Sequence, residues 1–153
     1  GLYELLAILK PQINSLTIMG DGEDWDRVVG LCDKLGIPTQ VFRNRPHREV
    51  LEFLRTFDGF GLAPYNRDSK WTYYCSPLKV SEYVASGVPV ITSAVPEIAG
   101  TIQNHRLGIV YDIGEAARIA VALDDFDPTD FHIRAKRFYE AFNSDRLFSQ
   151  VPL

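Results

Sequence analysis

The sequence lacks several features by which common functional classes are recognised. It has only two cysteines, Cys32 and Cys75, far apart, so neither a zinc-binding Cys-x-x-Cys pair nor a disulfide framework is expected. Its net charge of −4 argues against a nucleic-acid-binding surface. No apolar run reaches the roughly 18 residues of a membrane-spanning helix, and no secretory signal pattern is present. These absences favour a cytoplasmic protein that neither spans a membrane nor binds nucleic acid.

What the sequence does contain is typical of one globular domain. The chain has 153 residues, of which 46% are hydrophobic and 24% charged, and this is enough to bury a core. It opens with a short apolar run, Leu2 to Leu9, which indicates the end of a helix and stops at Pro11. We therefore interpret residues 1–153 as one domain and as a fragment of a longer protein.

Short apolar strands alternate with helical segments along the chain. Strands are expected at 15–19, 39–42, 58–63, 88–92 and 107–111. Short connections and apolar strands predict an α/β fold, a doubly wound, mostly parallel sheet with helices on both faces. In such Rossmann-like sheets, ligands bind at the carboxyl ends of the strands.

The stretch from Ser76 to Gly87 carries a complete set of helix signals. Ser76 suits the N-cap, Pro77 the first helical position, and Gly87 a left-handed stop. Lys79 lies in the first turn, where the helix dipole disfavours a cation unless an anion binds there. Glu82 follows one turn later on nearly the same side.

This pattern suits a nucleotide, with phosphates on the helix start and ribose hydroxyls on Glu82. A plain surface helix with Lys79 and Glu82 in solvent explains the same residues equally well, because a charge misplaced against the dipole costs only about 0.3–1 kcal/mol. The candidate phosphate-binding residues of this helix are Ser76, Pro77, Leu78 and Lys79.

The segment SPLKVSEYVASGVPVITS, residues 76–93, resembles the donor-binding signature of retaining glycosyltransferases with the GT-B fold, the glycosyl transferases group 1 family. The later VPEI, residues 95–98, follows in the family's order, and most of the chain can be laid onto the family's C-terminal domain. The resemblance implies that the helix start holds the donor diphosphate and that Glu82 holds the ribose. Tyr74 departs from the family, because many members have there a glutamate that contacts the transferred sugar.

The carboxyl ends of other predicted strands add candidates. The Gly20-Asp21-Gly22 turn lacks the third glycine of a dinucleotide fingerprint, so a plain tight turn is the stronger reading of it. The resemblance places this turn near the donor's sugar-phosphate and the residues after 39–42 near the nucleobase. Loop 65–74 would form a pocket wall or pack downward as an ordinary connection. The further candidates are Gly20 and Gly22 for phosphate, and Arg43, Asn44, Pro64, Tyr65 and Tyr74 for the base or the pocket wall.

No residue is assigned as catalytic. His47 would suit a base, but a histidine that packs on its own helical turn is the stronger reading, because no carboxylate or nucleophile is adjacent in sequence. We expect no cofactor and no metal, since a helix start with basic side chains can replace a cation at a diphosphate.

The resemblance implies a donor-binding domain that helps to transfer a sugar from a nucleotide-diphosphate sugar to an acceptor, such as a growing polysaccharide or a lipid-linked glycan. The acceptor would be held by an N-terminal domain of the same protein, so residues 1–153 alone are expected to be inactive. A non-catalytic nucleotide-sugar-binding or assembly module is the alternative. An oxidoreductase is disfavoured, because the full glycine fingerprint is absent.

Overall fold

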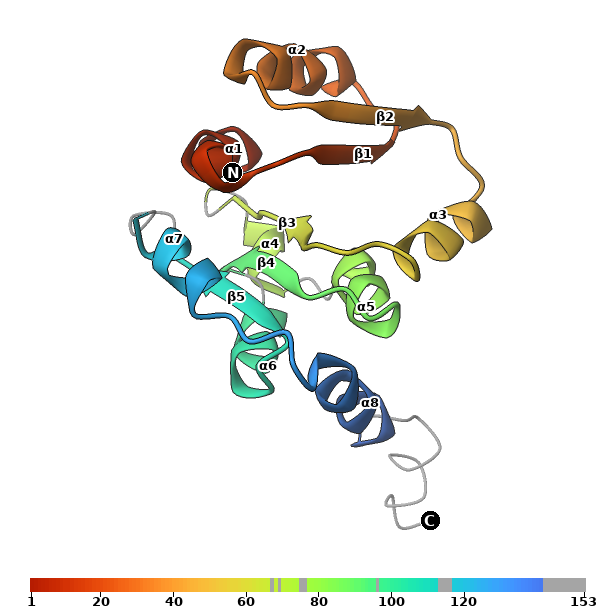
Figure 1. Cartoon of the computed structure of the whole chain (residues 1–153), viewed down its shortest axis with the longest axis vertical. Helices are drawn as coiled ribbons and strands as arrows, with labels where there is room; N and C mark the ends of the chain where they lie inside the picture. The colour runs from red at the N-terminus through yellow and green to blue at the C-terminus, as the bar shows by residue number, and fades with distance from the viewer. Residues whose placement is uncertain (67, 69, 75–76, 96, 113–116, 142–153) are drawn as a thin grey trace.

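The computed structural model describes residues 1–66, 68, 70–74, 77–95, 97–112 and 117–141, and shows helices packed around parallel strands (Figure 1). The strands are β1 (Leu16–Gly20), β2 (Thr39–Arg43), β3 (Gly61–Ala63), β4 (Val90–Ser93) and β5 (Gly108–Tyr111). The helices are α1 (Leu2–Leu9), the 3-10 helix η1 (Lys10–Gln12), α2 (Trp25–Leu35), α3 (His47–Leu54), α4 (Lys70–Tyr74), α5 (Leu78–Ala85), α6 (Ile98–Asn104), α7 (Ala117–Asp124) and α8 (Phe131–Ala141).

The predicted α/β class and the parallel direction of the paired strands are confirmed, but the strands form two sheets in place of one. β1 pairs with β2, and β3, β4 and β5 form a second sheet in that order. Two local expectations also change. β3 begins at Gly61 and not at residue 58, and the expected loop 65–74 contains the short helix α4. The prediction did not include the division into two sheets, because the periodicity of apolar residues does not specify which strand edges pair.

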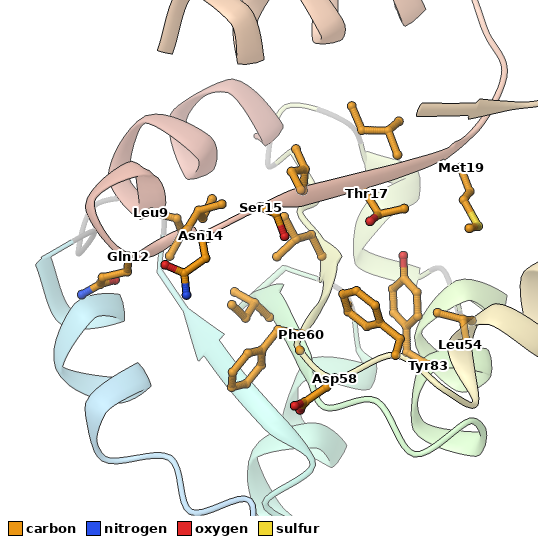
Figure 2. A pocket seen from close by; sticks show the side chains of 18 of the residues that line it. Leu9, Gln12, Asn14, Ser15, Thr17, Met19, Leu54, Asp58, Phe60 and Tyr83 are labelled. Carbon is orange, nitrogen blue, oxygen red and sulfur yellow. The ribbon is translucent and has the colours of Figure 1, made fainter. Parts of the chain in front are cut away.

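The facing edges of the two sheets line a cavity of about 610 Å³. Figure 2 shows β1 above this cavity, with Met19, Leu54, Phe60 and Tyr83 around it. Its walls come from β1, β3, β4 and the helices and loops around them, and include none of the residues predicted to bind a nucleotide. Tyr83 is the sequence neighbour of Glu82. This cavity and the predicted site are therefore different places.

The two larger clusters of buried side chains lie around the three-stranded sheet. One buried cluster joins β3 and β4 to α5, α6 and α8, and includes Val80, Val84, Val90 and Phe131. A second joins β4 and β5 to α1 and α7. Helix α1 also contributes Leu6 to a smaller cluster with α2, so it packs against both halves of the molecule. Burial of the two valines of α5 fixes this helix against the sheet.

The end of α5 follows the sequence signal closely. Gly87 has a φ of 85°, the left-handed conformation that a side chain disfavours. The Val88 N–H donates to the Tyr83 carbonyl at 2.9 Å and the Gly87 N–H donates to the Val84 carbonyl at 3.1 Å. These two bonds form a Schellman motif, which ends the helix and redirects the chain into β4.

The start of α5 differs from the prediction by one residue. Pro77 has extended backbone angles, φ −71° and ψ 116°, and is the N-cap, whereas we expected it at the first helical position. Its carbonyl accepts the Val80 N–H at 3.0 Å, so the proline opens the helix from outside. Ser76, the expected N-cap, lies outside the described residues.

Candidate functional site

The amino end of α5 faces solvent. Leu78 and Lys79 are its first two residues, and their N–H groups precede the first intrahelical bonds, which Val80 and Ser81 make to the Pro77 carbonyl. The Leu78 side chain is 77% exposed, and Lys79 is also exposed. Among the described residues, neither of these two N–H groups has a hydrogen-bond partner. Together with the positive end of the dipole and the ammonium group, they favour an anion.

Lys79 is held beside the end of β3. Its Nζ lies 5.4 Å from the centre of the Tyr65 ring, which is within the range of a cation–π contact. The Tyr65 backbone is bound twice by the buried Ser93, whose Oγ accepts from the Tyr65 N–H at 2.9 Å and donates to the Tyr65 carbonyl at 3.0 Å. Ser93 thus fixes the residue on which the lysine rests.

A second buried hydroxyl group fixes the backbone of Ala63, two residues before Tyr65. The buried Thr92 hydroxyl donates to the Ala63 carbonyl at 3.0 Å, across the β3–β4 pair. Sequence reasoning did not single out Thr92 or Ser93. The available signal was a pair of hydroxyl residues at the end of a fully buried strand, where burial requires hydrogen-bond partners.

Glu82 points to a neighbour that sequence reasoning did not connect with it. Its Oε1 lies 2.8 Å from Nε2 of His47, the first residue of α3. The Glu82 side chain is 32% exposed and that of His47 is 66% exposed, so the pair remains open to a ligand. The expectation that His47 packs on its own helical turn is wrong, because its ring joins α3 to α5.

A separate group lies at the carboxyl ends of β1 and β2. Arg43 donates to Asp21 at 2.7 Å, and its guanidinium lies 4.9 Å from the centre of the Trp25 ring. The bond from Arg43 and a further one from the Gly22 N–H hold the pKa of Asp21 below its usual value, and Asp21 raises the pKa of Arg43. The charge of Arg43 is thus already paired within the chain.

The predicted residues fall into groups and do not form one continuous strand edge. Lys79, Tyr65 and the preceding Pro64 lie together at the end of β3, and Arg43 and Asn44 accompany the Gly20–Gly22 turn. Figure 1 shows β2 ending beside α3, whereas β5 ends on the side of the molecule where α7 lies. The carboxyl ends of the two sheets therefore do not form one row.

Three predicted residues make few contacts. Gly20 and Gly22 have φ angles of 150° and 152°, and a Cβ at either would meet no atom within 4 Å. Tyr74 is 83% exposed at the end of α4.

Within the part of the chain described, no three His, Cys, Asp or Glu side chains gather as metal ligands. Over those same residues, no helix has the length and apolar content to cross a membrane.

Taken together, the geometry can bind an anion at the tip of α5 and hydroxyl groups at Glu82. Both features belong to one helix, three residues apart, which is about one turn. A molecule with phosphate and diol groups a few ångströms apart would satisfy both. The described residues of this helix present no nucleophile paired with a base, so the arrangement favours binding and charge stabilisation.

Comparison with known proteins agrees with the α/β fold described above. Residues 39–151 match the family model described as Glucosyltransferase 3-like, C-terminal domain. A search of curated proteins found no match. The solved structures that are similar to the chain include two of glycosyltransferases.

The first is WaaG, a glycosyltransferase involved in lipopolysaccharide biosynthesis, with a TM-score of 0.63 and 20% identity over 93% of this chain. The second is AviGT4, a glycosyltransferase involved in avilamycin A biosynthesis, with a TM-score of 0.58 and 18% identity over 99% of this chain. The match covers only 39% of the WaaG chain and 49% of the AviGT4 chain. At these identities the likeness concerns the fold.

Proposed function

The chain belongs to the Glucosyltransferase 3-like, C-terminal domain family, and from this premise we propose that it binds the nucleotide-diphosphate sugar donor of a glycosyltransferase. The diphosphate would lie on the amino end of α5, against the N–H groups of Leu78 and Lys79 and the Lys79 ammonium. Glu82, one turn along, would accept hydrogen bonds from the ribose hydroxyls.

The observation that supports this proposal most is the exposure of the α5 tip, where Lys79 stands against the dipole of its own helix. Without a ligand, such a lysine is slightly unfavourable. A cation–π contact with Tyr65 holds the Lys79 ammonium at the end of β3, and Ser93 holds Tyr65 in turn. Tyr65 and Ser93 thus maintain the position of the Lys79 ammonium, although this position improves no contact within the helix. An anionic ligand explains it well.

The same geometry explains how the domain would assist sugar transfer. When the bond between sugar and diphosphate breaks, negative charge grows on the departing phosphate oxygens. Backbone donors and an ammonium that are already in place stabilise that charge without reorganisation, so they act more strongly on the transition state than on the bound donor. The acceptor would come from an N-terminal domain of the same protein.

By analogy with WaaG, we propose a growing polysaccharide or a lipid-linked glycan as the acceptor, and the cytoplasm as the place of transfer. The solved relatives are more than twice as long as the matched region. Residues 1–153 alone are therefore expected to bind the donor nucleotide without turning it over.

The alternative is a non-catalytic nucleotide-sugar-binding or assembly module. One feature of the sequence favours it: by the resemblance to the glycosyl transferases group 1 family, Tyr74 stands where many members have a glutamate that contacts the transferred sugar. Tyr74 is 83% exposed. In that case the donor would still bind at α5, and transfer by the whole protein would be absent. Nucleotide binding therefore tests the part that both functions share.

The experiment is a calorimetric titration of the folded chain with UDP, GDP and ADP. We expect one of them to bind with a micromolar or weaker Kd, and Glu82→Gln to weaken it more than tenfold, since a hydrogen bond to a charged group contributes about 1.5–3 kcal/mol. Glu52→Gln is the matched control, because Glu52 is a surface glutamate paired with Arg48 at 2.8 Å on α3. Failure of all three nucleotides to bind would contradict the proposal.

A further inference from the structure

The contact between His47 and Glu82 links two helices that are 35 positions apart in the sequence. His47 is the first residue of α3, after Pro46, and Glu82 lies in the middle of α5. Val80 and Val84, on either side of Glu82 along α5, are buried, so the backbone that carries the carboxylate is fixed. The imidazole approaches the carboxylate from a different element, and the pair therefore sets where the carboxylate points.

The other charged side chains at the start of α3 are engaged elsewhere. Arg45 pairs with Glu49 at 3.3 Å and Arg48 pairs with Glu52 at 2.8 Å, both within the α3 region. His47 differs from both, since its bond is to α5. The contact is thus specific to one side chain and does not reflect a general attraction between a basic loop and an acidic helix.

The bond uses one of the two carboxylate oxygens of Glu82. His47 contacts Oε1, and within the part of the chain that the structure describes Oε2 has no hydrogen-bond partner. A carboxylate accepts several hydrogen bonds, so the pair leaves capacity for a hydroxyl donor. A free glutamate side chain must lose rotational freedom when it binds a ligand, whereas one already held by a neighbour loses less.

We propose that His47 is a positioning residue for ribose recognition: its Nε2–H holds Oε1 of Glu82, so that Oε2 is directed at the ribose hydroxyls of the nucleotide. This inference rests on the proposed function, and it adds a residue of α3 to a site otherwise built from α5 and the end of β3. It predicts that His47 affects affinity only through the ribose and leaves the diphosphate contacts unchanged.

The test compares each variant with two probes, the tightest-binding of UDP, GDP and ADP and its 2′,3′-dideoxy form, by calorimetry on the folded chain. We expect His47→Ala to weaken the ribonucleotide about fivefold, the scale of one net hydrogen bond, and to leave the dideoxy form unchanged. His47→Gln retains an N–H donor and should recover most of the affinity. Arg48→Ala is the matched control, because its partner is Glu52.

Three outcomes overturn the inference. If His47→Ala binds the ribonucleotide as tightly as the unmodified chain or more tightly, while Glu82→Gln binds it weakly, the histidine does not position the carboxylate and the proposed function stands. If the unmodified chain binds the ribonucleotide and its dideoxy form equally, no ribose hydroxyl is recognised. If no nucleotide binds, the proposed function itself fails.

Discussion

The two sheets of this molecule are buried to different degrees. All four residues of β4 are buried, whereas no residue of β1 or β2 is fully buried. Val41 of β2 is 46% exposed. One sheet is thus part of the core and the other is a partly open layer. The mostly apolar β1 is only partly buried, which shows that the burial of a strand depends on neighbouring elements as well as on its composition.

The elements around each sheet account for the difference. α5, α6, α7 and α8 contribute buried side chains to the clusters that contain β3, β4 and β5. The β1–β2 pair packs mainly with α1 and α2, and one edge of β1 borders the cavity of about 610 Å³. The proposed ligand-binding groups, Lys79 and Glu82, are carried by α5 and hence belong to the well-packed half.

The largest expected difference in the free energy of unfolding is between alanine substitutions at two glycines, one in each sheet. Gly108 of β5 and Gly20 of β1 have similar φ angles, 158° and 150°, but a Cβ at Gly108 would lie 2.0 Å from the Val90 carbonyl oxygen, and one at Gly20 would meet nothing within 4 Å. In both alanine variants the free energy of unfolding should fall by about 1–3 kcal/mol, because a side chain disfavours this backbone φ angle. Gly108→Ala should lose about 1–3 kcal/mol more through the clash with β4.

Urea unfolding followed by circular dichroism measures both free energies. Equal losses for Gly108→Ala and Gly20→Ala would mean that β4 and β5 are not as closely paired as the register Val90–Gly108 indicates. The comparison of the two sheets would then lose its structural basis.

A smaller difference in stability is expected between alanine substitutions at two isoleucines, one in each sheet. Ile91 of β4 is 2% exposed, and Ile18 of β1 is partly exposed. Ile91→Ala should destabilise the fold by about 2–5 kcal/mol, the cost of a cavity in a packed core. Ile18→Ala should cost less than half as much, because its side chain already borders an open space. Thermal unfolding of both variants gives the ranking, and an Ile18→Ala loss as large as that of Ile91→Ala would contradict it.

Much of this architecture was predictable from local patterns. Gly36 and Gly87 were correctly predicted as helix ends, and both have the left-handed φ angles that the signal requires. The alternation of strands and helices also followed from the sequence. The division into two sheets did not, because the pairing of β1 with β3, or its absence, depends on which long-range edges meet. No residue of either strand encodes that choice locally.

The site was predictable in part. The sequence indicated that Lys79 and Glu82 share one helix, and the structure agrees. It did not reveal that His47 reaches Glu82, because the two lie far apart in the chain, or that Asp21 already pairs with Arg43. Contacts of this kind arise only when separate elements are brought together, and a search for neighbouring catalytic groups in sequence therefore missed the histidine.

The most direct test of the account is an amide NMR titration of the folded chain with the tightest-binding of UDP, GDP and ADP. We expect the largest amide shifts at Leu78, Lys79 and Glu82 in α5 and at His47 in α3. Shifts confined to the cavity between the sheets, for example at Thr17 and Leu62, or no shifts at all, would contradict the claim that α5 carries the nucleotide site.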